Sequence, residues 1–166
     1  MSFIVSKNVQ KMSPSSTLAA MQKAQVLKAE GKDVIDLSIG EPDFDTPQFI
    51  KDAAWESLQK GQTKYTATAG VKPLQSAIVN FYKREFGVEI DSSQVMATSG
   101  GKQGLFNAIS TAVGEGDDVL IPKPYWVSFP EMVSFTGANS VFIDTEETNL
   151  ILTAEQVKKA ITPKTK

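Results

Sequence analysis

The chain has 166 residues, of which 41% are hydrophobic, 22% charged and 8% aromatic, and its formal net charge at pH 7 is -2. This length fits one ordinary domain or parts of two, and the apolar share is enough for a packed core, which argues against a disordered chain. The slightly acidic balance, without a block of basic residues, argues against nucleic acid and anionic membranes as partners.

Two residue types are missing: the sequence contains no cysteine and no histidine. Disulfides, thiolate zinc sites, cysteine nucleophiles and histidine-based triads are therefore excluded, and we expect no metal site. Any chemistry has to rest on carboxylates, lysines, tyrosines, backbone dipoles or a bound cofactor. Residues 1–10 lack the apolar core of a signal peptide, and no apolar run approaches membrane-spanning length, so a cytoplasmic protein is expected.

Helix and strand signals alternate along the first part of the chain. Serines and a threonine-proline pair stand where helix caps are expected, and glycines stand where helices end. Apolar residues recur at helical spacing between these signals. In chain order, the expected elements are a helix from Ser15 or Ser16 to Gly31, a strand at 34–39, a helix from Thr46-Pro47 to Gly61, a polar loop at 62–70 and a helix at 72–86.

From residue 94 onward, strands and helices are expected to alternate regularly. The expected elements are strands at 95–98, 118–122 and 141–143, a helix after each of the first two, and a last helix with a capping box at Thr153 and Gln156. This order predicts an α/β fold with a parallel sheet covered by helices. About three strands make an unusually small sheet. The polar residues 161–166 lead toward a further strand, so we expect a truncated chain.

Ser99-Gly100-Gly101-Lys102-Gln103 lies at a predicted strand-to-helix turn. Glycines let the backbone approach an anion closely, and the N–H groups and dipole of a helix start favour a phosphate, the dipole by about 0.3–1 kcal/mol. The spacing is neither that of a Walker loop nor that of GxGxxG. Taken alone, the pair is explained as well by a tight turn that needs glycine only for its backbone angles.

Pro122-Lys123-Pro124-Tyr125-Trp126 follows the next predicted strand, at the carboxyl end of the sheet, where ligands of open α/β sheets collect. Two aromatic side chains behind a loop stiffened by proline could stack on a flat heterocycle, worth about 0.5–1.5 kcal/mol beyond the buried area. The alternative is that Trp126 is simply a core residue.

Three further segments are ambiguous. Gly40, before the turn at Pro42, offers a backbone N–H without steric cover, but the pattern alone is only a turn. The hydroxyl of Tyr65, in the polar loop, could reach a ligand or cover a neighbour. Glu146 and Glu147 are adjacent acids in a polar loop, and a solvated surface explains them better than acid–base catalysis does.

These motifs occur together in the order found in class I aminotransferases. They are Gly40-Glu41-Pro42-Asp43-Phe44, Lys64-Tyr65, Ser99-Gly100-Gly101-Lys102-Gln103 and Pro124-Tyr125-Trp126. From about residue 9 to 166 the chain resembles that family, and within it the bacterial aspartate aminotransferases most. The resemblance implies a pyridoxal-phosphate-dependent transferase fold. Residues 1–46 would form an N-terminal arm and the first part of a small domain, and residues 47–166 the first part of the large, cofactor-binding domain.

The resemblance also implies roles for individual residues. Gly40 would bind the substrate α-carboxylate through its backbone N–H. Gly100-Gly101-Lys102 would hold the phosphate of pyridoxal 5'-phosphate, with Lys102 acting through its main chain. Trp126 would stack on the pyridine ring and also border the substrate. Tyr65 would reach the cofactor phosphate of the neighbouring subunit in a homodimer.

By the same resemblance, the Schiff-base lysine of the family and the groups around it would lie downstream of Lys166. No residue here is therefore assigned a catalytic role, and Lys102 is not a substitute. We expect an N-terminal fragment, inactive alone, of an enzyme that moves an amino group from aspartate or a similar amino acid to a 2-oxo acid. Aromatic, alanine, methionine and kynurenine transaminases share these motifs. Met12-Ser13-Pro14 has serine where prephenate-accepting members carry a basic residue, which argues against prephenate.

Two interpretations outside this activity stay open. The first is a nucleotide-binding domain that uses the glycine turn for a different phosphate, and it gives no role to Gly40 or Tyr65. The second is a non-catalytic interaction module that uses the fold only for dimerisation.

Overall fold

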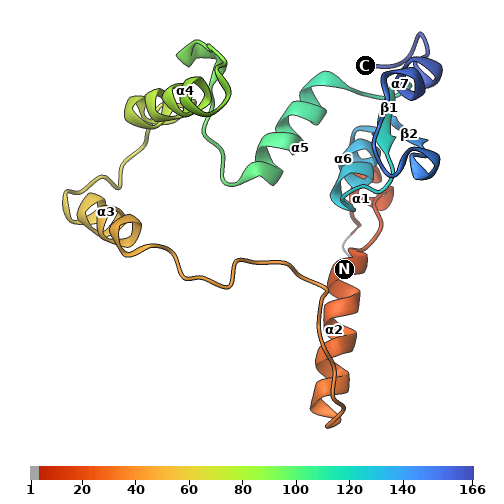
Figure 1. The fold of residues 1–166 in the computed structure, drawn as a ribbon, viewed down its shortest axis with the longest axis horizontal. Coiled ribbons are helices and arrows are strands. Elements are labelled where there is room, and N and C mark those ends of the chain that lie inside the picture. The colour runs from red at the N-terminus through yellow and green to blue at the C-terminus, as the bar shows by residue number, and fades with distance from the viewer. Residues whose placement is uncertain (1–3) are drawn as a thin grey trace. The chain divides into compact units, whose positions relative to one another are not determined.

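A computed structural model describes residues 4–166 (Figure 1). These residues divide into two compact units. One consists of the described residues up to Gly40 together with Leu105–Lys166, and the other is Glu41–Gly104. In chain order, the elements are α1 (Lys7–Gln10), α2 (Ser16–Ala29), α3 (Gln48–Gln59), α4 (Lys72–Phe86), the 3-10 helix η1 (Ser92–Gln94), α5 (Gly101–Ala112), β1 (Asp118–Pro122), α6 (Ser128–Thr136), β2 (Asn139–Ile143), the 3-10 helix η2 (Glu146–Thr148) and α7 (Ala154–Ala160).

The first unit contains the sheet. Strands β1 and β2 pair in parallel, with Leu120 opposite Val141. Because parallel neighbours need a crossover, α6 carries the chain back between them and packs on both strands. Ile121, Val133 and Ala138 form the buried core, which residues of α5 and α6 cover further. The predicted α/β fold class with a parallel sheet is confirmed.

The end of the chain lies against the other edge of β1. Thr165 forms a parallel bridge with Asp118, whose N–H donates to the carbonyl oxygen of Lys164 at 2.9 Å. The Lys166 N–H donates in turn to the carbonyl oxygen of Asp118 at 3.1 Å. Residues 161–166, which were expected to lead toward a further strand, thus contact β1 through this single bridge.

Most predicted helix ends are confirmed by their caps. The Ser15 hydroxyl accepts the N–H of Leu18 at the start of α2, and Gly87 ends α4 with a left-handed φ of 65°. The capping box at the start of α7 is complete, because Thr153 and Gln156 bond each other's backbone N–H groups. No helix within residues 4–166 is long and apolar enough to cross a membrane.

Three expectations are wrong. Residues 34–39 and 95–98 form no strand, because nothing in the described part of the chain pairs with them along a ladder, and a strand without a partner leaves its backbone groups unbonded. Thr46 does not cap α3, whose N-cap position is Pro47 and carries no side-chain hydrogen bond.

In the second unit, a buried side chain fastens the segment before the glycine turn to α4. Gln75 is only 4% exposed, and its amide nitrogen donates to the carbonyl oxygens of Val95 at 3.0 Å and Ser92 at 3.4 Å. A buried amide of this kind needs such partners to offset the loss of water. Residues 95–98 are therefore held in place without belonging to a sheet.

Candidate functional site

The glycine turn closes on itself just before α5. Gly100 has φ +83°, in the left-handed region that costs other residues about 1–2 kcal/mol. Its N–H donates to the carbonyl oxygen of Thr98 at 2.8 Å, and the Thr98 hydroxyl donates to the carbonyl oxygen of Gly100 at 3.0 Å. The backbone requirement for glycine at position 100 is therefore met, as expected of a tight turn.

A side chain from the first turn of α5 also closes the loop. The Ser99 N–H donates to Oε1 of Gln103 at 2.5 Å. This N–H is therefore already engaged, and an anion at the turn has to be held by backbone groups further along, at the helix start. The motif alone does not reveal this bond of Gln103. Its position four residues after Ser99, on the expected first helical turn, is the signal that could have revealed this bond.

The fold itself does not require glycine at position 101. Its φ lies outside the left-handed region, and a Cβ added there would meet no atom within 4 Å. The twelve-residue helix α5 thus begins with a bare backbone open to its surroundings. A phosphate suits this arrangement, because helix N-termini attract anions and glycine permits close approach. The residues at this turn fit the phosphate of pyridoxal 5'-phosphate.

Tyr65 lies on the polar loop of the second unit and is fully exposed, at 107% of its reference area. Within its unit, Tyr65 therefore covers no neighbour, which was one of the two interpretations of this residue. The loop is tied to the segment before the glycine turn, since the Ala97 N–H donates to the carbonyl oxygen of Ala69 at 3.0 Å.

The aromatic pair follows β1 in the first unit. Trp126 is 45% exposed and lies edge-on to Phe129, with ring centroids 5.7 Å apart. Tyr125 stacks on Phe142 of β2, at 5.0 Å and an interplanar angle of 25°. Trp126 is therefore not a core residue in this unit.

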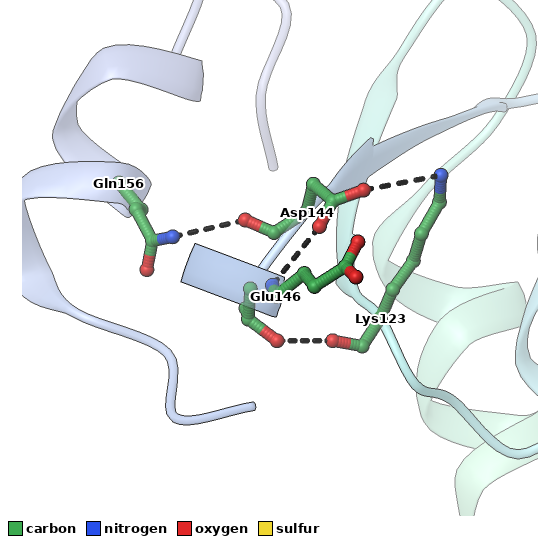
Figure 2. A network of polar contacts seen from close by, with 5 residues as sticks. Lys123, Asp144, Glu146 and Gln156 are labelled. Atoms are coloured by element: carbon green, nitrogen blue, oxygen red, sulfur yellow. Dashed lines mark hydrogen bonds and ion pairs between the residues drawn. The ribbon is translucent and has the colours of Figure 1, made fainter. Parts of the chain in front are cut away.

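A polar network fixes the residues that follow β1 and β2 (Figure 2). Thr145, 1% exposed, donates its hydroxyl hydrogen to the carbonyl oxygen of Lys123. The Lys123 ammonium lies 4.0 Å from the carboxylate of Asp144, and the Glu146 N–H donates to that carboxylate at 3.0 Å. The side-chain amide of Gln156 donates to the carbonyl oxygen of Asp144 at 2.9 Å. The Glu146 side chain is exposed, as expected of a solvated surface.

Gly40 is exposed, and a Cβ added there would meet no atom within 4 Å. The chain before it turns at Asp36, whose carboxylate accepts the Ser38 hydroxyl at 2.5 Å and the Ser38 N–H at 3.0 Å. Both hydrogen bonds lower the pKa of Asp36 below the usual aspartate value. The bond from the Ser38 hydroxyl has the larger effect, and the bond from the Ser38 N–H the smaller.

The predicted site residues divide between the two units. The first unit carries Gly40 and Trp126, and the second carries Tyr65, Gly100, Gly101 and Lys102. Their assignment to one common site stays a prediction, as do the domain limits of 1–46 and 47–166.

Comparison with known proteins identifies one family. The family model for aminotransferase class I and II matches residues 32–166. The probable aspartate/prephenate aminotransferase of Rhizobium leguminosarum bv. phaseoli is 50% identical over 157 residues, which are 94% of this chain and 39% of that protein. The aspartate aminotransferase of Bacillus sp. strain YM-2 is 46% identical over 98% of this chain and 42% of its own length.

Solved structures agree with these matches. The aspartate aminotransferase of Thermus thermophilus with maleate has a TM-score of 0.92 and 42% identity, covering 99% of this chain and 44% of that one. The aspartate aminotransferase of Rhizobium meliloti has a TM-score of 0.93 and 38% identity, covering 99% and 41%. The chain thus spans about two fifths of the length of the proteins it resembles.

Proposed function

The chain belongs to the class I and II aminotransferases, and on that basis we propose that it supplies the cofactor-holding residues of an enzyme that moves an amino group from aspartate, or a similar amino acid, to a 2-oxo acid. The observation that carries this proposal is the bare backbone of Gly101 at the start of α5, with open space where a side chain would stand. Pyridoxal 5'-phosphate, when bound, supplies the electron sink that amino-group transfer needs.

Each proposed contact uses a group whose exposure suits it. The backbone at Gly100-Gly101-Lys102 would bind the cofactor phosphate, and the half-exposed ring of Trp126 would stack on the pyridine ring and border the substrate. Tyr65, which covers nothing in its own unit, would reach the phosphate of the neighbouring subunit in a homodimer. Gly40 would bind the substrate carboxylate through its N–H.

No residue of this chain is proposed to act as the catalytic lysine or as an acid–base group. These residues would hold and orient the cofactor: the helix start would favour the phosphate charge, and Trp126 would shield one face of the ring from water. We place the enzyme in the cytoplasm, with residues 1–46 as arm and small-domain segment and 47–166 in the large domain.

Aspartate is the proposed amino donor, in line with the names of the relatives. The relative that is 50% identical also carries prephenate in its name, whereas Ser13 is not the basic residue expected of prephenate-accepting members. Amino-group exchange should therefore be measured with both compounds on the cofactor-loaded full-length enzyme, and we expect aspartate to be preferred.

The cofactor-holding role is tested by binding of pyridoxamine 5'-phosphate to the 166-residue chain, measured by calorimetry. This ligand has no aldehyde, so it cannot react with surface lysines. We expect binding that weakens at least about tenfold for pyridoxamine, which lacks the phosphate, because charge-assisted hydrogen bonds would be lost. Equal affinity for the two ligands would contradict the proposal. ATP and NAD are measured in parallel, since preferential nucleotide binding would favour the nucleotide-binding alternative.

A matched pair of variants locates the site. Gly101→Ala adds a methyl group in the open space at the turn. Gly114→Ala also adds a methyl group with no atom within 4 Å, but at a position away from the start of α5. Neither glycine has a left-handed φ, so both variants should fold. Only Gly101→Ala should weaken pyridoxamine 5'-phosphate binding, and the same affinity in both variants would remove Gly101 from the site.

A further inference from the structure

We propose that Thr145 is a positioning residue for Trp126: its hydroxyl group holds the backbone just before Pro124 and so sets the place of the aromatic pair. That Trp126 stacks on a cofactor ring rests on the proposed function. The positioning of Trp126 rests only on contacts within one compact unit.

The hydroxyl of Thr145 joins the ends of β1 and β2 just past their last backbone hydrogen bond. The Lys123 N–H donates to the carbonyl oxygen of Ile143 at 2.9 Å, which extends the parallel pairing one step beyond β1. Because alternate residues of a strand face the same neighbour, the carbonyl oxygen of Lys123 faces β2 as its N–H does. The Thr145 hydroxyl bonds the carbonyl oxygen of Lys123 at this place. A hydrogen bond from a side chain thus joins the two strand ends past their last regular pair.

Loss of the hydrogen bond between Thr145 and Lys123 is unfavourable because the hydroxyl is buried. Thr145 is 1% exposed, and a buried hydroxyl that loses its partner is disfavoured because no water replaces it. The side chain is also branched at Cβ, which limits its rotamers. The Lys123 carbonyl is therefore held at one position.

Two contacts connect the residues around Pro124 with the ring of Phe142 in β2. The Lys123 ammonium lies 5.8 Å from the centroid of the Phe142 ring, and Tyr125 stacks on that ring at 5.0 Å. The residues on either side of Pro124 are thus both fixed to the end of β2. Trp126 follows at once, edge-on to Phe129 at the start of α6.

Thr145 is itself held from the opposite side. Its carbonyl oxygen accepts the N–H and the hydroxyl of Thr148, at 3.1 and 3.0 Å, and the N–H of Leu150 at 2.9 Å. Gln156 of α7 bonds the carbonyl oxygen of the preceding Asp144, as Figure 2 shows. The threonine therefore lies in a framework of hydrogen bonds.

The test follows Trp126 as the only tryptophan. The chain has two, and Trp55→Phe leaves Trp126 as the sole reporter. In that background, Thr145→Val removes the hydroxyl and keeps the shape, whereas Thr145→Ser keeps the hydroxyl. Thr136→Val is the matched control, because its hydroxyl also donates to a carbonyl oxygen, that of Val133 at 2.8 Å. Acrylamide quenching of Trp126 and binding of pyridoxamine 5'-phosphate are measured for each.

We expect Thr145→Val to increase acrylamide quenching of Trp126 and to weaken ligand binding about fivefold to tenfold, because the stacking surface is no longer pre-organised. Thr145→Ser should restore both quantities, and Thr136→Val should change neither. A Thr145→Val variant whose Trp126 is quenched no more than in the Thr136→Val control would overturn the proposal.

Two further measurements keep the outcome decisive. If the Thr145→Val variant loses the circular dichroism signal of a folded chain, Thr148→Val is tested in its place. Thr148→Val removes one hydrogen-bond donor to the Thr145 carbonyl oxygen and should raise the quenching of Trp126 to a smaller extent. No rise in quenching would overturn the proposal. If the parent chain does not bind pyridoxamine 5'-phosphate, the proposed function fails, and the quenching comparison still decides the role of Thr145.

Discussion

The N–H of Ala97 donates to the carbonyl oxygen of Ala69 at 3.0 Å, which ties the loop carrying Tyr65 to the segment just before the glycine turn. Gly70, the next residue, stands against this contact with a φ of +95°. A Cβ at Gly70 would come within 2.8 Å of the Ala97 Cβ. The absence of a side chain at Gly70 is therefore a condition for this close approach.

Gly70→Ala should destabilise the chain by about 2–4 kcal/mol, the sum of a left-handed φ and a steric overlap. Urea unfolding followed by circular dichroism measures it. Gly61→Ala is the control, because Gly61 has φ +71° but open space around its added Cβ, and it should lose only the backbone part, about 1–2 kcal/mol. Equal losses in the two variants would show that the Ala97 contact is unimportant.

Gln103→Glu should affect stability and anion binding in opposite directions. A carboxylate in the first turn of α5 can still accept the Ser99 N–H and interacts favourably with the helix dipole, by about 0.3–1 kcal/mol. The same charge repels a phosphate at the turn, which should weaken pyridoxamine 5'-phosphate binding roughly fivefold at low salt and less at high salt. Calorimetry at two salt concentrations, beside thermal unfolding, measures both effects.

Gln59→Glu serves as the control for the Gln103 variant. It makes the same charge change at the exposed last residue of α3, in the same compact unit. In the Gln59→Glu variant, the affinity for pyridoxamine 5'-phosphate should stay at the parental value. Weakened binding in both variants alike would mean that net charge, rather than the position of Gln103, decides anion affinity.

Local signals predicted most of the helices, whose hydrogen bonds lie within the element or its caps, and those strands that have a partner in the chain. The bounds of α4 and of β1 agree with the predicted 72–86 and 118–122, and Gly87 ends its helix as expected. Residues 34–39 have the composition of a strand, yet Ile35 and Leu37 are 85% and 88% exposed. A strand depends on a partner that its own sequence does not contain, and this is why the prediction failed there.

In the candidate site, too, features that depend on neighbouring residues could be predicted, and features that depend on distant residues could not. The glycine turn and the aromatic pair could be predicted, because glycine pairs and proline-flanked aromatics are visible as motifs. The hydrogen bond of Thr145 could not, because its hydroxyl bonds a residue 22 positions earlier in the chain. Only the parallel register of β1 and β2 brings Thr145 to the carbonyl group of Lys123.

Ser38→Ala should raise the pKa of Asp36. The hydroxyl and N–H of Ser38 stabilise the charged carboxylate, which holds its pKa below the usual value. A pKa that is lower in the folded than in the unfolded chain contributes stability above the unfolded pKa, and this contribution disappears as the pH falls through the folded pKa. Carboxyl carbon shifts followed by NMR between neutral and strongly acidic pH measure the titration of Asp36.

Asp91 is the internal control for this titration. Its pKa is also lowered, chiefly by the bond from the Ser93 hydroxyl and then by that from the Ser93 N–H. In the Ser38→Ala variant the pKa of Asp91 should stay low while that of Asp36 moves up. An Asp36 titration unchanged by the substitution would show that the Ser38 hydroxyl does not stabilise the Asp36 carboxylate.

Glu131→Ala should release the N-terminal residues from α6. The Ser13 N–H donates to the Glu131 carboxylate at 2.7 Å, and α1 packs on α6. A hydrogen bond to a charged acceptor contributes about 1.5–3 kcal/mol, and less where the bond is exposed, as here, so we expect a loss of about 1 kcal/mol. Trypsin should cleave after Lys11 faster in Glu131→Ala than in the parent or in Glu147→Ala, which removes a carboxylate from η2. Glu131→Gln keeps an acceptor oxygen and should cleave at an intermediate rate. Equal rates in Glu131→Ala and Glu147→Ala would show that the arm is held by the packing of α1 alone.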